Sequence, residues 1–151
     1  MKTTKVILLK NKNVFYVDKN GNIINAIVKK SIMVLKSGKA ITELRIYKKD
    51  KQLIVTLEDL NSLFATKEAA QKHLSGEKNV NNRLEFVSMK VKHFNFHEPI
   101  EIKRLRNQQY LVGEETRAVF DTESQSVYVQ YDLYNPITDK NVYCFSDEIL
   151  R

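Results

Sequence analysis

The sequence predicts a mainly β protein that consists of two small barrel-like modules and one short α-helix. Short runs of β-branched and aromatic residues recur along the chain, turn residues separate these runs, and only residues 66–76 carry the signals of a helix. The chain has 151 residues, of which 42% are hydrophobic, so it can hold one ordinary domain or two very small ones. We expect the first module to span residues 1–76 and the second to span residues 83–151.

The strands of the first module follow from its turns. Residues 14–17 lead into Asn20-Gly21, a pair that favours the positive φ angles of a tight hairpin. The return run, residues 23–35, is rich in β-branched residues and predicts one long strand that bends or bulges near Lys29-Lys30-Ser31. Further strands are expected over residues 40–47 and 53–56. The expected core side chains are Val14, Tyr16, Ile27, Leu44, Ile46, Leu53 and Val55.

A short helix closes this module. Thr66 is a favourable N-cap for residues 67–74, Glu68 lies near the positive end of the helix dipole, and Gly76 follows the end of the helix. An isolated helix of two turns is marginal in water, so we expect its apolar side to pack on other residues. Residues 75–82 contain little to bury and form the expected linker.

The second half also divides into short strands. They are expected over residues 83–96, 100–105, 110–112, 117–120, 126–134 and 142–145. The intervening turns are expected at residues 113–115, 121–124 and 135–139. The hydrophobic runs follow a similar order in both halves, and each half ends in a strand, an acidic pair and a Leu. Two explanations stay open, namely duplication of one barrel-like unit or two unrelated runs of strands.

One segment carries a resemblance to a known family. Glu58-Asp59-Leu60 is followed by Leu63-Phe64-Ala65-Thr66-Lys67-Glu68-Ala69-Ala70, in which a strand passes into a capped helix. With this ending, residues 14–70 resemble the small SH3-like barrel proteins of bacteria and their phages. That family commonly uses its barrel for binding or assembly and has no catalytic role for it. The resemblance covers the first half of the chain and implies an SH3-like barrel there. The second half resembles the family only through the similar order of its hydrophobic runs, so two SH3-like barrel modules follow if the second half is a degenerate copy without the helix.

The sequence contains no pattern for catalysis or for a metal or cofactor. No glycine-rich phosphate loop, zinc spacing or calcium loop is present. His73 lies on the expected helix, while a strand would place His93 and His97 about 13 Å apart, too far to share a metal ion directly. Cys144 lies in an apolar run and is expected to be a small buried side chain. We expect neither an enzyme nor a bound cofactor.

The positive charge is concentrated in the first module. The chain has 25 Lys and Arg against 18 Asp and Glu, and residues 1–50 contain 12 of these basic residues and 3 of the acidic ones. The cations would contact an anionic partner, and two tyrosines could stack on bases. The residues expected to bind a partner are Lys29, Lys30, Arg45, Lys48, Lys49, Tyr16 and Tyr47. The alternative is that the lysines protect exposed strand edges and keep the protein soluble.

These features predict a non-enzymatic interaction or assembly protein, such as a structural component of a phage or of a bacterium. We expect a protein partner or self-association, because the positive first half is complementary to the mildly negative second half. The alternative is a nucleic-acid-binding protein that uses the basic first module. The first apolar run, Val6 to Leu9, is too short for a membrane segment, so we expect no membrane partner and a location in the cytoplasm or in a phage particle.

Overall fold

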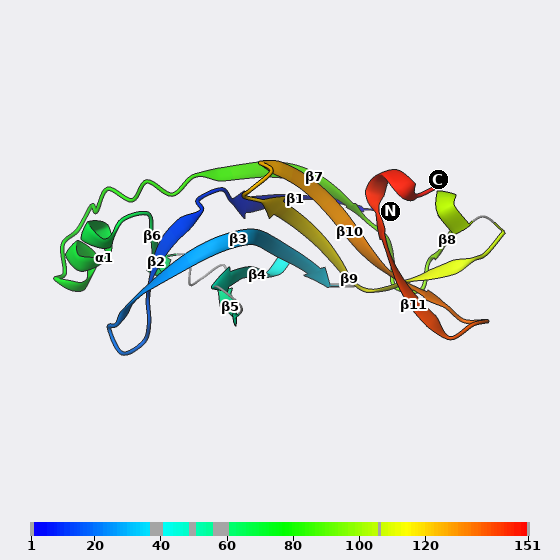
Figure 1. Ribbon diagram of the computed structural model, residues 1–151, viewed down its shortest axis with the longest axis horizontal. Coiled ribbons are helices and arrows are strands. Elements are labelled where there is room, and N and C mark those ends of the chain that lie inside the picture. The colour runs from blue at the N-terminus through cyan, green and yellow to red at the C-terminus, as the bar shows by residue number, and fades with distance from the viewer. Residues whose placement is uncertain (1, 37–40, 49–50, 56–60, 106, 151) are drawn as a thin grey trace.

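The residues that the structure describes are mainly β, with one short α-helix and antiparallel sheets, as the sequence predicts. This computed structural model describes residues 2–36, 41–48, 51–55, 61–105 and 107–150. Figure 1 shows an elongated, arched molecule in which the helix lies at one end and the C-terminus at the other. The first half contains β1 (Lys2–Leu9), β2 (Asn13–Val17), β3 (Ile23–Lys36), β4 (Ile41–Lys48), β5 (Lys51–Val55), β6 (Leu63–Phe64) and α1 (Lys67–Leu74). The second half contains β7 (Phe86–His93), β8 (Pro99–Ile100), the 3-10 helix η2 (Lys103–Leu105), β9 (Tyr110–Asp121), β10 (Ser126–Asn135), β11 (Lys140–Phe145) and the 3-10 helix η3 (Ser146–Glu148).

Two sheets contain these strands. β1 and β7 form a two-stranded antiparallel ribbon, and the other strands form a nine-stranded sheet whose main path is β11-β10-β9-β3-β2-β6. β4 and β5 extend this sheet from β3, and β8 pairs with β9. In Figure 1 the ribbon lies along the arch formed by β3, β9 and β10. The pairs β1–β7 and β3–β9 join the two halves, and the division into modules 1–76 and 83–151 stays a prediction.

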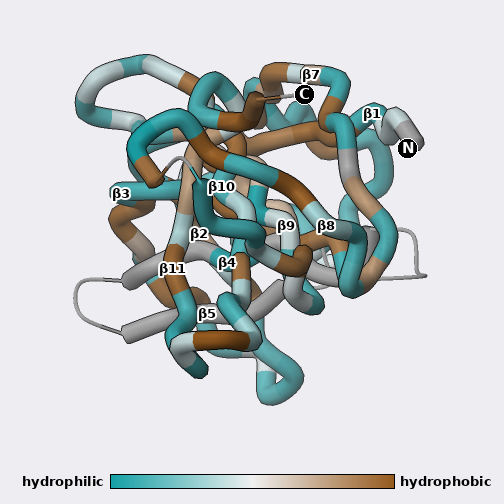
Figure 2. The backbone as a smooth tube through the Cα atoms, turned by 90° about the vertical axis from the view of Figure 1, so that its right-hand side faces the viewer, coloured by the Kyte–Doolittle hydropathy of each residue, from teal (hydrophilic) through white to brown (hydrophobic). Residues whose placement is uncertain are grey.

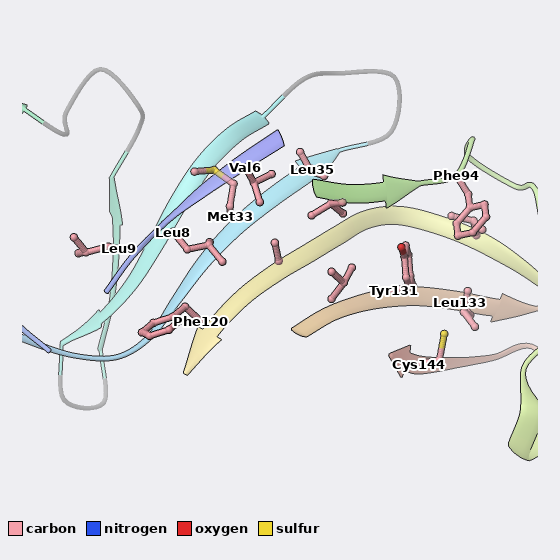
Figure 3. Close-up of a cluster of buried hydrophobic side chains, with 14 of the residues drawn as sticks. Val6, Leu8, Leu9, Met33, Leu35, Phe94, Phe120, Tyr131, Leu133 and Cys144 are labelled. Atoms are coloured by element: carbon pink, nitrogen blue, oxygen red, sulfur yellow. The ribbon is translucent and has the colours of Figure 1, made fainter. Parts of the chain in front are cut away.

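The main hydrophobic core lies between the ribbon and one face of the large sheet. Val6, Leu8 and Val91 of the ribbon are fully buried. The sheet residues that Figure 3 labels in this core are Met33, Leu35, Phe120, Tyr131, Leu133 and Cys144. In Figure 2 the loops that protrude from the strands are mostly hydrophilic, as expected for chain that remains in water. Both halves supply side chains to this main core.

The predicted irregularity in β3 is confirmed. The pairing of β3 with β4 shifts between Val28 and Ser31, so β3 contains one more residue than β4 across this interval. Lys29 and Lys30 lie at the bulge and are exposed. The Thr122 hydroxyl donates to the carbonyl oxygens of Val28 at 2.7 Å and of Lys29 at 2.9 Å, which holds the bulge against the turn after β9.

The bulge changes which residues of β3 face the main core. Ala26 and Val28 face the core before it, and Met33 and Leu35 face the core after it, because an extra residue reverses the alternation of side chains. The expectation that Ile27 is a core residue is wrong. Ile27 is 41% exposed, since its two neighbours occupy the core side of the strand.

Of the other expected core residues of the first module, the structure describes the side chains of two. Val14 is fully buried, as predicted, and Tyr16 is half-buried and packs against the main core. The side chains of Leu44, Ile46, Leu53 and Val55 lie outside the part of the chain whose side chains the structure describes.

The hairpin between β2 and β3 turns as predicted, but with one positive φ angle. Gly21 has a φ of 80°, whereas Asn20 does not have a positive φ. The Asp18 carboxylate accepts hydrogen bonds from the backbone N–H of Asn20 at 2.9 Å and of Asn22 at 2.8 Å. The bond from the Asn22 N–H contributes most to lowering the pKa of Asp18 below its usual value. The turn therefore depends on one glycine and one ionised carboxylate.

The short helix and its cap are confirmed. Thr66 has an extended backbone, and its hydroxyl oxygen accepts a hydrogen bond from the Ala69 N–H at 3.1 Å. Ala69 and Ala70 are buried and pack with Val17 and Phe64 in a small second core. The helix thus covers the end of the sheet at β2 and β6.

The expected linker, residues 75–82, has no regular secondary structure, and its first residues are exposed. Its last residue is nevertheless attached to the sheet. The Asn82 amide donates to the Leu63 carbonyl oxygen at 2.6 Å and accepts from the Ala65 N–H at 3.1 Å. The amide therefore completes the hydrogen bonding of the short strand β6.

The second half differs from the prediction in three segments. The strand expected over residues 83–96 is shorter and is restricted to β7, residues 86–93. Residues 100–105 do not form a strand, because they contain the end of β8, an isolated bridge from Ile102 to Ile149, and η2. Residues 113–115 do not form a turn, because they lie within the continuous strand β9. The β9–β10 register shifts there, and β10 pairs with β9 on both sides of the shift, so the extra residues bulge and the strand continues.

The order of strand pairing is the same in both halves. In the first half β2, β3, β4 and β5 pair in succession, and the chain then passes through a 3-10 turn at residues 61–62 before β6 returns to β2. In the second half β8, β9, β10 and β11 pair in succession, and after η3 Ile149 forms a bridge to Ile102 near β8. The corresponding strands β1 and β7 pair with each other, as do β3 and β9.

Replacing Thr66 by Ala should lower the free energy of unfolding by about 1 kcal/mol, because the Ala69 N–H loses its acceptor. Urea unfolding followed by circular dichroism measures this change. Lys67→Ala is the matched control, since Lys67 is exposed and does not cap the helix, and it should change stability by less than about 0.5 kcal/mol. Equal losses in the two variants would contradict the capping role.

Cys144 should resist alkylation while the protein is folded. Its side chain is 1% exposed, and burial, together with the charge of Glu148, raises the pKa of its thiol to about 12. The reactive thiolate is therefore scarce at mildly alkaline pH. Mass spectrometry after iodoacetamide treatment should show little modification of the native chain and complete modification in guanidinium chloride. Rapid modification of the native chain would contradict the burial of this thiol.

Candidate interaction surface

The residues predicted to bind a partner lie in different surroundings. Lys29 and Lys30 are exposed at the bulge in β3. Arg45 instead forms an ion pair with Glu115 at 3.3 Å, and Tyr16 packs against the main core. The side chains of Tyr47 and Lys48, and the whole of Lys49, lie outside the described residues. The partner-binding role of this set stays a prediction.

A row of charged side chains crosses the face of the large sheet that lies opposite the main core. From β9, the Arg117 Nη2 atom lies 2.8 Å from the Glu115 Oε2 atom, and its Nη1 atom lies 2.6 Å from the Asp132 Oδ1 atom on β10. The Arg117 Nη2 atom also donates to the Asp132 Oδ2 atom at 3.1 Å, so the Arg117–Asp132 contact is bidentate. Arg45 on β4 completes the row through Glu115.

The row is electrostatically balanced and partly shielded from water. The side chain of Arg117 is 19% exposed and that of Asp132 is 27% exposed. Burial works against the charge of Arg117, but the hydrogen bond and charge of Asp132 and the charge of Glu115 outweigh it, so the pKa of Arg117 is raised. The guanidinium group is therefore charged and held in one position.

Aromatic side chains surround this fixed cation. The guanidinium carbon of Arg117 lies 5.7 Å from the centre of the Tyr143 ring on β11, within the range of a cation–π interaction. The rings of Tyr128 and Phe145 meet edge to face, with their centres 5.3 Å apart. Tyr143 is 55% exposed and Phe145 is 44% exposed. We name the group of Arg117, Asp132, Tyr128, Tyr143 and Phe145 the Arg117 face.

No protein-family model, curated protein or solved structure matches this chain.

Strand alternation and one bulge position the Arg117 face. Cys144 points into the main core, so its neighbours Tyr143 and Phe145 point to the opposite face. Gly113 lets β9 approach β10 closely at the bulge, because a Cβ atom at this position would lie 3.1 Å from the Asp132 carbonyl oxygen. This close approach brings the Asp132 carboxylate within reach of Arg117.

The edge of the sheet beside this face is partly covered. The Arg104 guanidinium donates a hydrogen bond to the Tyr143 carbonyl oxygen, and the Glu148 carboxylate accepts one from the Phe145 N–H at 3.1 Å. Arg104 and Glu148 also lie 3.6 Å apart as an ion pair. These contacts occupy backbone groups that an added strand would need, so the side chains of the face are more accessible to a partner than the edge.

The Arg117 face was not predicted from the sequence, although the sequence contains one signal for it. Glu115 and Arg117 are two residues apart, so both lie on one side of a strand, but the predicted turn at 113–115 separated them. Asp132 and Tyr143 come from later strands, and only the register of β9, β10 and β11 brings them together.

No group of three or more His, Cys, Asp and Glu residues within the described part of the chain could hold a metal ion. The His73 ring lies beside Phe64, and the His97 ring stacks on Phe96 in a turn after β7. No helix among the described residues is long and apolar enough to span a membrane.

Replacing Asp132 by Ala should lower the free energy of unfolding by about 1 kcal/mol, because Arg117 loses a bidentate partner in a partly shielded position. Glu123→Ala is the control, since Glu123 is exposed in the turn after β9, and it should change stability by less than about 0.5 kcal/mol. Thermal and urea unfolding measure both variants. A silent Asp132→Ala variant would show that the row of charges does not stabilise the sheet.

Proposed function

We propose that the protein is a non-enzymatic interaction protein that associates with a second copy of itself through the Arg117 face. A role as a structural component of a phage or a bacterium, in the cytoplasm or in a phage particle, belongs to the same proposal. The observation that carries it is the exposure of Tyr143 and Phe145 beside an arginine that two carboxylates hold in place.

The composition of the face supports a protein interface. Tyr and Arg are the residue types that most often dominate binding energy at such interfaces, and they do so best when they are held in position before binding. Arg117 meets this condition through Glu115 and Asp132. Binding would therefore cost little side-chain entropy at the centre of the contact.

The arrangement of charge supports a second copy as the partner. The row contains two cations, Arg45 and Arg117, and two carboxylates, Glu115 and Asp132. In a two-fold symmetric dimer the same surface lies on both sides, so a strongly one-signed surface would repel itself. A row with both signs can meet its own copy with opposite charges in contact.

We also propose that the chain consists of two SH3-like modules, and the repeated order of strand pairing supports this. Both halves contain four successive antiparallel strands and then a 3-10 segment; the chain afterwards returns to β2 in the first half and to Ile102, close to β8, in the second. Duplication of one SH3-like unit explains this order and explains why corresponding strands lie side by side. In this interpretation the chain already contains an internal dimer of its two modules.

A nucleic-acid-binding role remains the alternative, and the exposure of Lys29 and Lys30 favours it. These lysines lie on the bulge, and Lys30 pairs across the strands with Asp121, whose carboxylate reduces the local positive charge. The two functions differ in their response to salt. About six phosphate contacts would reduce affinity for DNA roughly 10³-fold between about 50 and 200 mM salt, whereas a contact with an aromatic centre loses much less.

Sedimentation velocity over a range of protein concentrations tests the proposal. The wild type should form dimers, and Tyr143→Ser with Phe145→Ser should shift the association constant by at least about tenfold toward monomer, as loss of aromatic anchors does. Ile137→Ser is the matched control, because Ile137 is 89% exposed in the turn between β10 and β11 and lies outside the face. It should leave the association unchanged.

The same experiment distinguishes self-association from nucleic-acid binding. Addition of a short DNA duplex should leave sedimentation of the wild type unchanged. A monomeric wild type at all concentrations would contradict self-association. Salt-sensitive binding of the duplex that disappears in a Lys29→Glu, Lys30→Glu variant would establish the nucleic-acid role instead.

A further inference from the structure

A pocket lies on the other side of the large sheet, between β7, β10 and the C-terminal segment. Its volume is about 700 Å³, within the range of small-molecule sites. Its lining residues are Met89, Lys90, Lys92, Phe94, Glu98, Val129, Tyr131, Ser146 and Ile149. None of these residues belongs to the Arg117 face, so the pocket is a separate feature.

The floor of the pocket is apolar, and contacts among its side chains hold them in place. Val129, Tyr131 and Phe94 belong to the main core, and the rings of Phe94 and Tyr131 lie 5.4 Å apart. In Figure 3 the Phe94 side chain extends from the segment after β7 and the Tyr131 side chain extends from β10, and the planes of the two rings are inclined by 60°. The Tyr131 hydroxyl donates to the Lys92 carbonyl oxygen. Burial raises the pKa of Tyr131 to about 12, so the hydroxyl keeps its proton at neutral pH.

The polar groups of the pocket wall are mainly cationic. Lys90 and Lys92 line the pocket and are exposed, and because they flank Val91, whose side chain is buried in the core, their side chains point to the outer face of the ribbon, at the rim of the pocket. Lys90 lies directly opposite Lys5 in the β1–β7 ribbon. Like charges placed opposite each other across two strands are destabilising. Within the described part of the chain, no ion pair neutralises these three lysines. Bound negative charge would relieve this repulsion.

Glu98 is the one carboxylate among the lining residues of the pocket. Two lysines line the pocket and a third lies on the adjacent strand, so positive charge exceeds negative charge around the pocket. Ser146 adds a hydroxyl that can donate to an anion. The combination is an apolar floor with positively charged side chains at the rim.

We propose that this pocket binds a small amphipathic organic anion. The apolar part of the ligand would lie on Phe94, Val129 and Tyr131, and its carboxylate or other anionic head would contact the ammonium groups of Lys90 and Lys92. The apolar contact supplies affinity through burial of surface, and the charge contacts supply orientation and selectivity. This inference does not depend on self-association through the Arg117 face.

Calorimetric titration of the full-length protein with three probes tests the proposal at neutral pH. Decanoate has both the apolar chain and the anionic head, decyltrimethylammonium has the same chain with a cationic head, and acetate has the head alone. Decanoate should bind, and the other two should bind at least about tenfold more weakly, because each lacks one of the two contacts. Equal binding of decyltrimethylammonium or of acetate would overturn the proposal, as would no binding of decanoate.

Substitutions test whether decanoate binds in this pocket. Lys90→Gln with Lys92→Gln should weaken decanoate binding by about tenfold, while Lys29→Gln with Lys30→Gln removes the same charge elsewhere and should have no effect. Ile149→Trp should weaken decanoate binding by filling the pocket while both lysines remain. Glu98→Gln should strengthen binding, because it removes a like charge. Equal loss in the two lysine pairs would show a general charge effect and would overturn the assignment of this pocket.

Discussion

The pairing of β3 with β9 is the constraint on which the rest of the structure depends. It runs from Lys30 opposite Asp121 to Lys36 opposite Glu115, and it joins the two halves of the chain in the middle of the large sheet. Because β3 also pairs with β2 and β4, and β9 with β8 and β10, both strands have neighbours on each side. Because β3 and β9 lie in the middle of the large sheet, β1 and β7 cover one face of this sheet, and the Arg117 face lies on the opposite side.

Two bulges determine which side chains of these central strands and their neighbours lie at the surface. The bulge in β3 reverses the alternation of side chains and places Lys29 and Lys30 outside, while the Ser31 hydroxyl accepts a hydrogen bond from the Leu9 N–H at 3.1 Å and ties β1 to the sheet. The bulge in β9 at Gly113 brings Asp132 toward Arg117. Both are local departures from regular pairing, and each changes the side chains that a partner would meet.

The Arg117 face and the pocket differ in the chemistry that they offer. The face is open, has balanced charges and presents aromatic rings, which suits a flat protein surface. The pocket has an apolar floor and unbalanced positive charge, which suits a small anion. They use opposite sides of β10, since Tyr131 points to the pocket while its neighbour Asp132 points to the face. A ligand in the pocket and a partner on the face would therefore be separated by one layer of backbone.

The sequence by itself determined the β class, the strand over residues 23–35 with its bulge, the Gly21 turn and the Thr66-capped helix, because short-range backbone preferences decide each of these. It predicted the exposure of Lys29 and Lys30 but missed the Arg45–Glu115 contact, which joins residues far apart in the chain. Only the tertiary structure decided that Ile27 faces outward, that residues 113–115 continue a strand, and that Arg117, Asp132 and Tyr143 meet. The physical reason is that these features depend on the register between strands, which the main core selects by burying one set of alternating side chains from both halves.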